Sequence, residues 1–159
     1  MTFSTRFSCR VGPLTLEGDD FRLTRLGFGA PSVPQGDAAS LSAAAIQLEQ
    51  YFAGERTSFD LELATGGTEF ERRVWDEVSA IPYGSTATYA EIAARIGRPA
   101  ACRAVGRANA LNPIALLIPC HRVVGSDGSL TGYAGGIEMK RALLAHEARV
   151  VAGAAAVAA

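Results

Sequence analysis

Apolar residues follow two different spacings along this chain, and the change falls at Gly66-Gly67. Before it, the segments FSTRFSCRV, LTLEG and FRLTRLGF alternate apolar and polar residues, which is typical of strands that bury one face. After it, apolar residues recur every three or four positions, as in FERRVWDEVSAI, which is typical of helices. The sequence therefore predicts an α+β fold, in which a small N-terminal domain with a β-sheet and a helix packs on a mostly helical C-terminal domain.

The N-terminal domain is expected over residues 1–66. Residues 1–30 predict a β meander, because Gly, Pro and Asp residues interrupt the alternation twice. A helix is expected over residues 40–53, with Ser40 as its N-cap. Residues 57–63 alternate again and favour one more strand.

The C-terminal domain, residues 67–149, contains a pattern typical of a helix-turn-helix. Thr68 is the expected N-cap of a first helix, and Thr88 caps a second, YAEIAARIG. A short turn, Gly97-Arg98-Pro99, then leads into AACRAVGRANAL. The helix AACRAVGRANAL consists largely of small residues, which favours close contact with a narrow DNA groove or, equally, tight packing against another helix.

Three further segments complete the chain. Residues 114–118, IALLI, are fully apolar and are expected to be buried in any conformation. A last helix is expected over residues 137–148, with a turn-rich loop before it. Residues 150–159, VVAGAAAVAA, are too short to span a membrane and are expected to form a disordered tail.

The composition favours a folded chain, and no uninterrupted apolar run is long enough to cross a bilayer. Hydrophobic residues make up 48% of the chain and charged residues 19%, which suffices for a core. No secretory signal is recognisable, and the three cysteines cannot all pair, so we expect a cytoplasmic protein with reduced thiols.

Charge is distributed unevenly, although the net charge is only −1. Residues 1–71 carry 5 Arg against 10 Asp and Glu, whereas residues 72–159 carry 10 Lys and Arg against 6. Five arginines fall in an acid-free stretch: Arg95, Arg98, Arg103, Arg107 and Arg122. This stretch suits contact with phosphates or, alternatively, is a solvated basic face.

A candidate reactive cysteine with an adjacent base lies in the stretch Ile118-Pro119-Cys120-His121-Arg122-Val123. A free thiol is mostly protonated at neutral pH and needs a base, which His121 can supply. Glu147 in the last helix can orient that base. The alternatives are inert packing of a buried cysteine, a metal site, a redox site and a cysteine protease. Too few Cys and His residues are present for a structural zinc, and no C-x-x-C pair exists.

PCHRV, preceded by NPIALLI and followed by GYAGG and KRALLAHE, resembles the O6-alkylguanine-DNA alkyltransferase family. The resemblance covers roughly residues 68–148. It implies DNA repair by irreversible, single-turnover transfer of a methyl or other alkyl group to a protein cysteine. The group would come from O6 of guanine, and from O4 of thymine, after the base is flipped out of duplex DNA.

The resemblance also implies roles in the chemistry. Cys120 would accept the alkyl group, His121 would generate the thiolate through a water, and Glu147 would orient His121. Asn112 would brace the cysteine's turn, and Lys140 resembles a lysine near the reacting centre.

Roles in recognition follow in the same way. Tyr89 would act on the target phosphate and help protonate the departing guanine, and Arg103 would enter the gap left by the flipped base through the minor groove. Other contacts are expected from residues on the DNA face and in the base pocket. These are Arg98, Ser126 and Ala104 at the DNA, and Tyr133, Val123 and Ala134 around the guanine.

The sequence departs from the family pattern at some positions. Some members hold a structural zinc in the N-terminal domain, but here only Cys9 lies there, so we expect no metal and no cofactor. Ala134 stands where many members have Ser. The expected partner is double-stranded DNA containing O6-alkylguanine, bound by a monomer that does not associate with membranes. The alternative function is a non-catalytic sensor of alkylated DNA, which the intact Cys120 disfavours.

Overall fold

The computed structural model describes residues 1–158, with side chains through residue 154, and divides into two compact units. The first unit contains Met1–Gly66 and Pro113–Leu117, and the second contains Gly67–Asn112 and the chain from Ile118 onward. Residues 113–117 were expected in the C-terminal domain. They belong to the first unit because Leu26 pairs with them, donating to the Pro113 carbonyl and accepting from Ala115 N, each at 3.0 Å.

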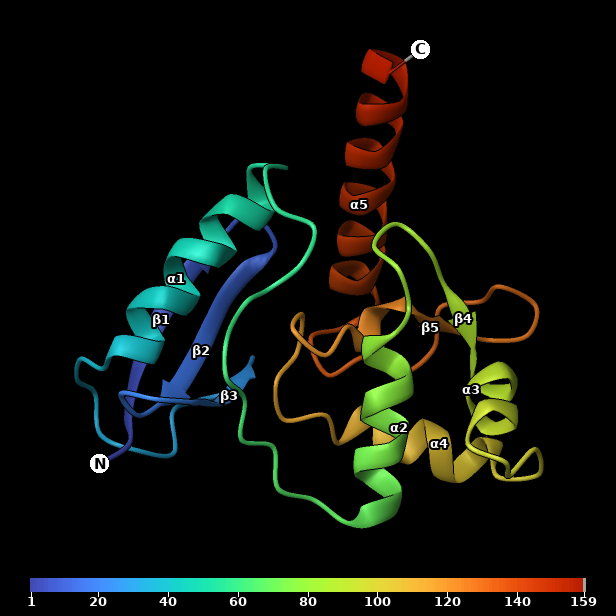
Figure 1. Ribbon diagram of the computed structural model, residues 1–159, viewed down its shortest axis with the longest axis horizontal. Coiled ribbons are helices and arrows are strands. Elements are labelled where there is room, and N and C mark those ends of the chain that lie inside the picture. Colours follow the sequence, from blue (N-terminus) through green and yellow to red (C-terminus); the bar gives the residue numbers. More distant parts are fainter. Residues whose placement is uncertain (159) are drawn as a thin grey trace. The chain divides into compact units, whose positions relative to one another are not determined.

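The first unit is a three-stranded antiparallel sheet with one helix along one face (Figure 1). Its elements are β1 (Phe3–Cys9), β2 (Gly12–Gly18), β3 (Leu23–Gly27) and α1 (Ala39–Phe52). The core of this unit contains alternating residues of β2, Leu14 and Leu16, and residues from one face of α1, Leu41 and Leu48. The apolar side of the sheet and the apolar side of the helix are therefore buried against each other. The predicted fold class is confirmed.

The start of α1 differs from the prediction. Ala38 is the N-cap residue and makes no side-chain capping bond, and the N–H of Ala39 donates to Asp20 Oδ1 at 3.1 Å. Ser40 lies inside the helix and is buried, so its prediction as the N-cap is wrong. A carboxylate from the turn before β3 satisfies the helix start instead.

The strand predicted over residues 57–63 is also wrong. Only Leu63 pairs with the sheet, through a single bridge to Leu23. Farther back, the amide of Gln47 on α1 binds both backbone groups of Asp60, at 2.8 and 3.0 Å. A side chain therefore occupies hydrogen-bonding groups that a strand needs for its ladder.

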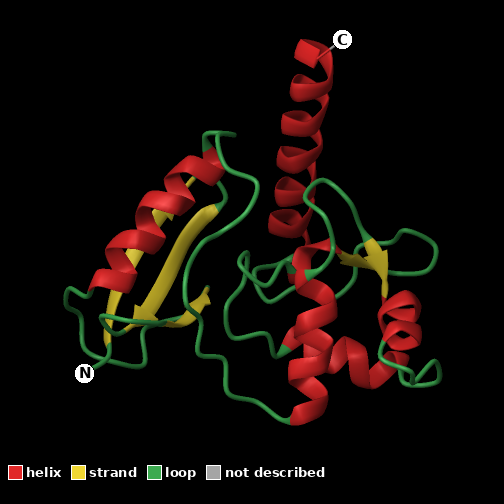
Figure 2. Cartoon of the chain, viewed as in Figure 1, coloured by secondary structure: helices red, strands yellow, loops and turns green. Residues whose placement is uncertain are grey.

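The second unit is mostly helical (Figure 2). Its elements are α2 (Glu69–Ser79), β4 (Ala87–Thr88), α3 (Tyr89–Arg95), α4 (Cys102–Ala110), the 3-10 turn η1 (Cys120–Arg122), β5 (Val123–Val124) and α5 (Ile137–Ala158). Thr68 and Thr88 each form a capping box, as their positions before Glu71 and Glu91 indicate. The parallel pairing of β4 with β5 was not anticipated, because two-residue strands leave no periodic signal.

The last helix is longer than expected. It continues from residue 148 through Ala158, so the segment expected to be a disordered tail is helical over residues 150–158. Residue 159 of that expected tail lies outside the described residues. Among the described residues, no helix combines the length and hydropathy needed to cross a bilayer.

Candidate active site and nucleic-acid interface

Two asparagine side chains hold the backbone around Cys120. Asn112 Nδ2 donates to the Ile118 carbonyl at 2.7 Å, and Asn109 Nδ2 donates to the Cys120 carbonyl at 3.3 Å. Pro119 restricts the same turn. Because Asn109 belongs to α4, the cysteine's backbone is tied directly to the second helix of the helix-turn-helix.

His121 and Glu147 form a buried pair. His121 Nε2 lies 2.7 Å from Glu147 Oε2, and neither side chain is exposed. Burial lowers the pKa of His121, although the adjacent carboxylate opposes this. A neutral imidazole that donates from Nε2 to the carboxylate keeps Nδ1 as an acceptor. His121 Nδ1 is buried and has no hydrogen-bond partner among the described residues, which suits it to receive a proton.

Arg122 holds both oxygens of the same carboxylate. Its Nε and Nη2 donate to Glu147 Oε1 and Oε2 at 2.8 and 3.1 Å, and Nη1 donates to the Ile81 carbonyl at 2.8 Å. Burial alone would raise the pKa of Glu147, but the bonds from His121 and Arg122 outweigh it and hold that pKa well below its ordinary value. Arg122 is buried, so its assignment to a phosphate-binding basic stretch is wrong.

Cys120 has a raised pKa because it is buried. A hydrogen bond from Asn112 and the charge of Lys140 act in the opposite direction. Lys140 is itself buried, and its Nζ donates to the carbonyls of Val123 and Thr131. Ionisation of the thiol therefore depends on a proton acceptor, for which His121 is the candidate, and on nearby positive charge, which Lys140 supplies.

The Thr131 carbonyl joins α3, α5 and the loop between β5 and α5. It accepts from Lys140 Nζ at 3.1 Å and from the Tyr89 hydroxyl at 3.3 Å. The pKa of Tyr133, in the same loop, is raised by burial and by the nearby charges of Cys120 and Glu147. The loop therefore brings Tyr89, Lys140 and Tyr133 into one region with the sulfur.

The expected base-pocket residues differ in their surroundings. Val123 is fully buried, and its carbonyl already accepts from Lys140. Ala134 lies exposed in the loop before α5. Ser126, expected to contact the DNA backbone, is exposed in the same loop, and its side chain forms no hydrogen bond within the described part of the chain.

The helix α4 separates a buried face from an exposed one. Val105, Ala108 and Asn109 are buried, and Trp75 Nε1 donates to the Ala108 carbonyl at 2.8 Å. Arg103 and Ala104, both expected at the DNA, are exposed. The guanidinium of Arg98, in the preceding turn, lies 5.7 Å from the centre of the Phe70 ring.

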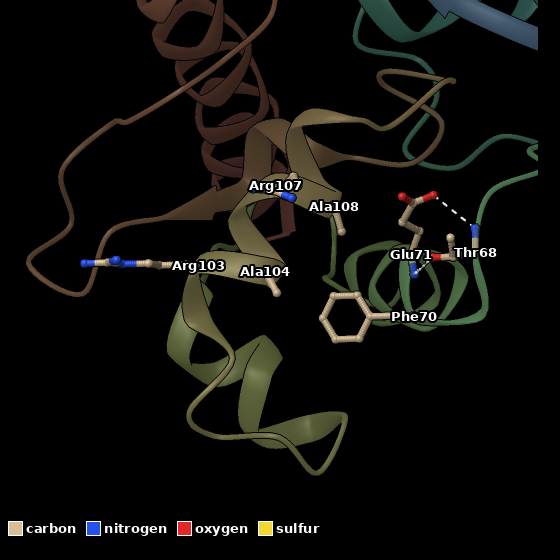
Figure 3. A pocket seen from close by; sticks show the side chains of 7 residues that line it. All are labelled: Thr68, Phe70, Glu71, Arg103, Ala104, Arg107 and Ala108. Atoms are coloured by element: carbon tan, nitrogen blue, oxygen red, sulfur yellow. Dashed lines mark hydrogen bonds between the residues drawn. The ribbon is translucent and has the colours of Figure 1, made fainter.

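A hollow of about 340 Å³ lies between the start of α2 and α4 (Figure 3). The methyl groups of Ala104 and Ala108 point toward the ring of Phe70, while Arg103 extends away from it. Arg107 also lines the hollow. The hollow thus lies on the helix expected at the DNA.

Sequence reasoning missed Asn109, Arg122 and Thr131 as parts of the site. Asn109 carried a usable signal, because it lies four residues after Val105 on the apolar stripe of its helix, where a polar residue needs a buried partner. Arg122 offered no signal beyond its place after His121. Thr131 acts through its backbone carbonyl, which no side-chain pattern reveals.

Comparison with known proteins assigns both parts of the chain. Residues 69–149 match the model of the 6-O-methylguanine DNA methyltransferase DNA-binding domain, and residues 3–65 match that of the ribonuclease-like domain of the same enzymes. A methylated-DNA–protein-cysteine methyltransferase of Mycobacterium bovis is 51% identical over 140 residues, covering 84% of this chain and 85% of the relative. One from Methanosarcina acetivorans is 48% identical, covering 87% and 93%.

Solved structures agree with this assignment. The O6-methylguanine methyltransferase of Mycobacterium tuberculosis is 49% identical, with a TM-score of 0.86 over 94% of each chain. The Mycobacterium tuberculosis OGT solved in complex with DNA is 48% identical, with a TM-score of 0.86 over 94% of this chain and 93% of that one. The chain belongs to the 6-O-methylguanine DNA methyltransferase family.

Proposed function

We propose that this DNA repair alkyltransferase moves the alkyl group from O6 of guanine in duplex DNA onto Cys120. The observation that carries the proposal is the 2.7 Å contact between His121 Nε2 and Glu147 Oε2, with His121 Nδ1 buried and unpartnered in the described residues. Family membership and the likeness to a DNA-bound relative support alkyl transfer and DNA binding.

The proposed reaction is a displacement at carbon. His121 takes the proton of the Cys120 thiol, through a water, and the charge of Lys140 stabilises the thiolate. The sulfur then forms a bond to the alkyl carbon as the bond from that carbon to O6 breaks. The bonding electrons stay with guanine, which takes up a proton with help from Tyr89. The product is a thioether, and no water-driven step restores the thiol, so each molecule reacts once.

Access to the reacting atom requires the base to leave the stack. We place α4 in the minor groove, with Arg103 filling the gap and the small residue Ala104 allowing close approach. Arg98 and Ser126 contact the DNA backbone in this proposal, and Asn112 braces the reacting turn. Tyr133, Val123 and Ala134 surround the extruded guanine, and O4-alkylthymine is a second substrate.

A reduced thiol is needed throughout, so the proposed compartment is the cytoplasm. The three cysteines are free, as this requires. The active species in this proposal is a monomer, because one chain supplies every group named above.

The test follows a labelled methyl group from O6-methylguanine in a duplex. The expected result is one label per protein molecule, with Cys120→Ala retaining DNA binding but accepting no label. Binding without transfer by the unaltered protein would instead identify a damage sensor. Release of the label into solution with continued turnover would identify a hydrolase.

A further inference from the structure

The exposed face of α4 carries a second arginine beside the one expected in the DNA. Arg107 follows Arg103 by four residues, and residues at this spacing lie on the same side of a helix, about 6 Å apart along its axis. Both are exposed, while Val105 and Asn109 are buried on the opposite side. A duplex that meets Arg103 therefore also meets Arg107.

Arg107 has no partner of its own. Within the described residues its guanidinium makes no hydrogen bond and no ion pair, whereas the guanidinium of Arg122 is fully engaged. The acid that lines the hollow, Glu71, accepts a hydrogen bond from the backbone N–H of Thr68 at 3.0 Å in the capping box. The charge of Arg107 is thus available to an anion from outside the chain.

The hollow beside Arg107 has an apolar floor. Phe70, Ala104 and Ala108 form that floor, and Arg107 lies on its wall (Figure 3). Deoxyribose presents an apolar edge next to each phosphate, so the combination of floor and guanidinium fits one sugar-phosphate unit of a DNA strand. A guanidinium binds phosphate through paired N–H groups.

We propose that Arg107 binds a DNA phosphate one helical turn from Arg103, with the adjoining deoxyribose packed in the hollow on α4. The inference rests on the proposed contact of DNA with α4. It adds a contact that is independent of base sequence and of damage, because every strand offers the same phosphate.

The test is the salt dependence of binding to an undamaged, fluorescently labelled duplex, measured by anisotropy with the full chain. The slope of log affinity against log salt is negative, and each lost phosphate contact lowers its magnitude by about 0.9. We expect Arg107→Gln to lower the magnitude by that amount, equally on duplexes of different sequence, while Arg107→Lys keeps the wild-type slope.

Arg149→Gln is the matched control. Arg149 is exposed on α5 and has no side-chain partner within the described residues, so its loss removes the same charge from another helix. Wild-type slope in Arg107→Gln, or an equal drop in Arg149→Gln, overturns the inference and leaves the proposed function standing. Failure of the wild-type protein to bind the undamaged duplex overturns the inference alone, whereas failure to bind a duplex with O6-methylguanine as well overturns both.

Discussion

Glu147 is a carboxylate with no exposed surface, yet it stays ionised because several donors surround it. His121 and Arg122 bind its two oxygens, and the backbone N–H of Gly84 donates to Oε1 at 3.2 Å. Removing one partner of a buried ion pair leaves the other charge uncompensated. The group that orients the proposed base is therefore also a determinant of stability.

We expect Glu147→Gln to lower the free energy of unfolding by about 3–5 kcal/mol, because Arg122 is left buried without its counter-charge. Urea unfolding measures this change. Glu138→Gln is the control, since Glu138 lies on the same helix and pairs with Arg141 at the surface, where such pairs contribute little. Similar losses of stability in the two variants would contradict the prediction, because they would mean that leaving Arg122 without its buried counter-charge costs no more than breaking a surface ion pair.

Elements with local signals could be predicted from sequence, and those completed from a distance could not. Thr68 and Thr88 each cap a helix together with the Glu three residues later, whose side chain accepts a hydrogen bond from the backbone of the threonine. This pattern is local and can be read from the sequence. The start of α1 depends on Asp20, nineteen residues before Ala39, and so Ser40 was misplaced as its cap. The proposed nucleophile, base and orienting acid were recognisable in the sequence by residue type, but the two hydrogen bonds from Arg122 to Glu147 form only on folding.

The turn at Gly84 connects α5 to the site. Gly84 has a φ of 77°, and a Cβ added there would lie 2.5 Å from Val151 Cγ2. Val151 belongs to the part of α5 that the sequence indicated as a tail. The extended helix therefore lies against the turn that also binds Glu147.

We expect Gly84→Ala to destabilise the protein more than Gly97→Ala does. Gly97 has nearly the same φ, 76°, but nothing near its added Cβ, so it reports backbone strain alone, about 1–2 kcal/mol. Thermal or urea unfolding measures both. Val151→Ala should remove part of the excess in a double-mutant cycle. Equal costs at the two glycines would mean that α5 does not pack on this turn in solution.

At the scale of the molecule, two features concern the path of the chain and the distribution of its charge. The chain leaves the second unit after Asn112, contributes residues 113–117 to the first, and returns at Ile118, just before the proposed nucleophile. The basic half of the chain is also the half that holds α4 and the Cys120 turn. The spacing of apolar residues does not predict that residues 113–117 join the first unit, and the charge counts do not predict that Arg122 is buried.

We expect the stability of the protein to fall as the pH drops from about 6.5 to about 5. Folding lowers the pKa of His121 below its ordinary 6.5 and that of Glu147 below its ordinary 4.5, so the unfolded chain binds more protons in this range. Stability is therefore full above about pH 6.5 and is lost as the pH falls. Urea unfolding across the range measures it, and a gain on acidification would contradict the assigned charge states.

The identity of the alkyl acceptor is tested most directly by peptide mass mapping of all three cysteines. The protein is allowed to react with a duplex carrying O6-methylguanine and is then digested. We expect one added methyl group, on the peptide that contains Cys120, with Cys9 and Cys102 unmodified and no further uptake from fresh DNA. A methyl group on either of the other cysteines, or an unmodified Cys120 after the DNA has been repaired, would contradict this prediction.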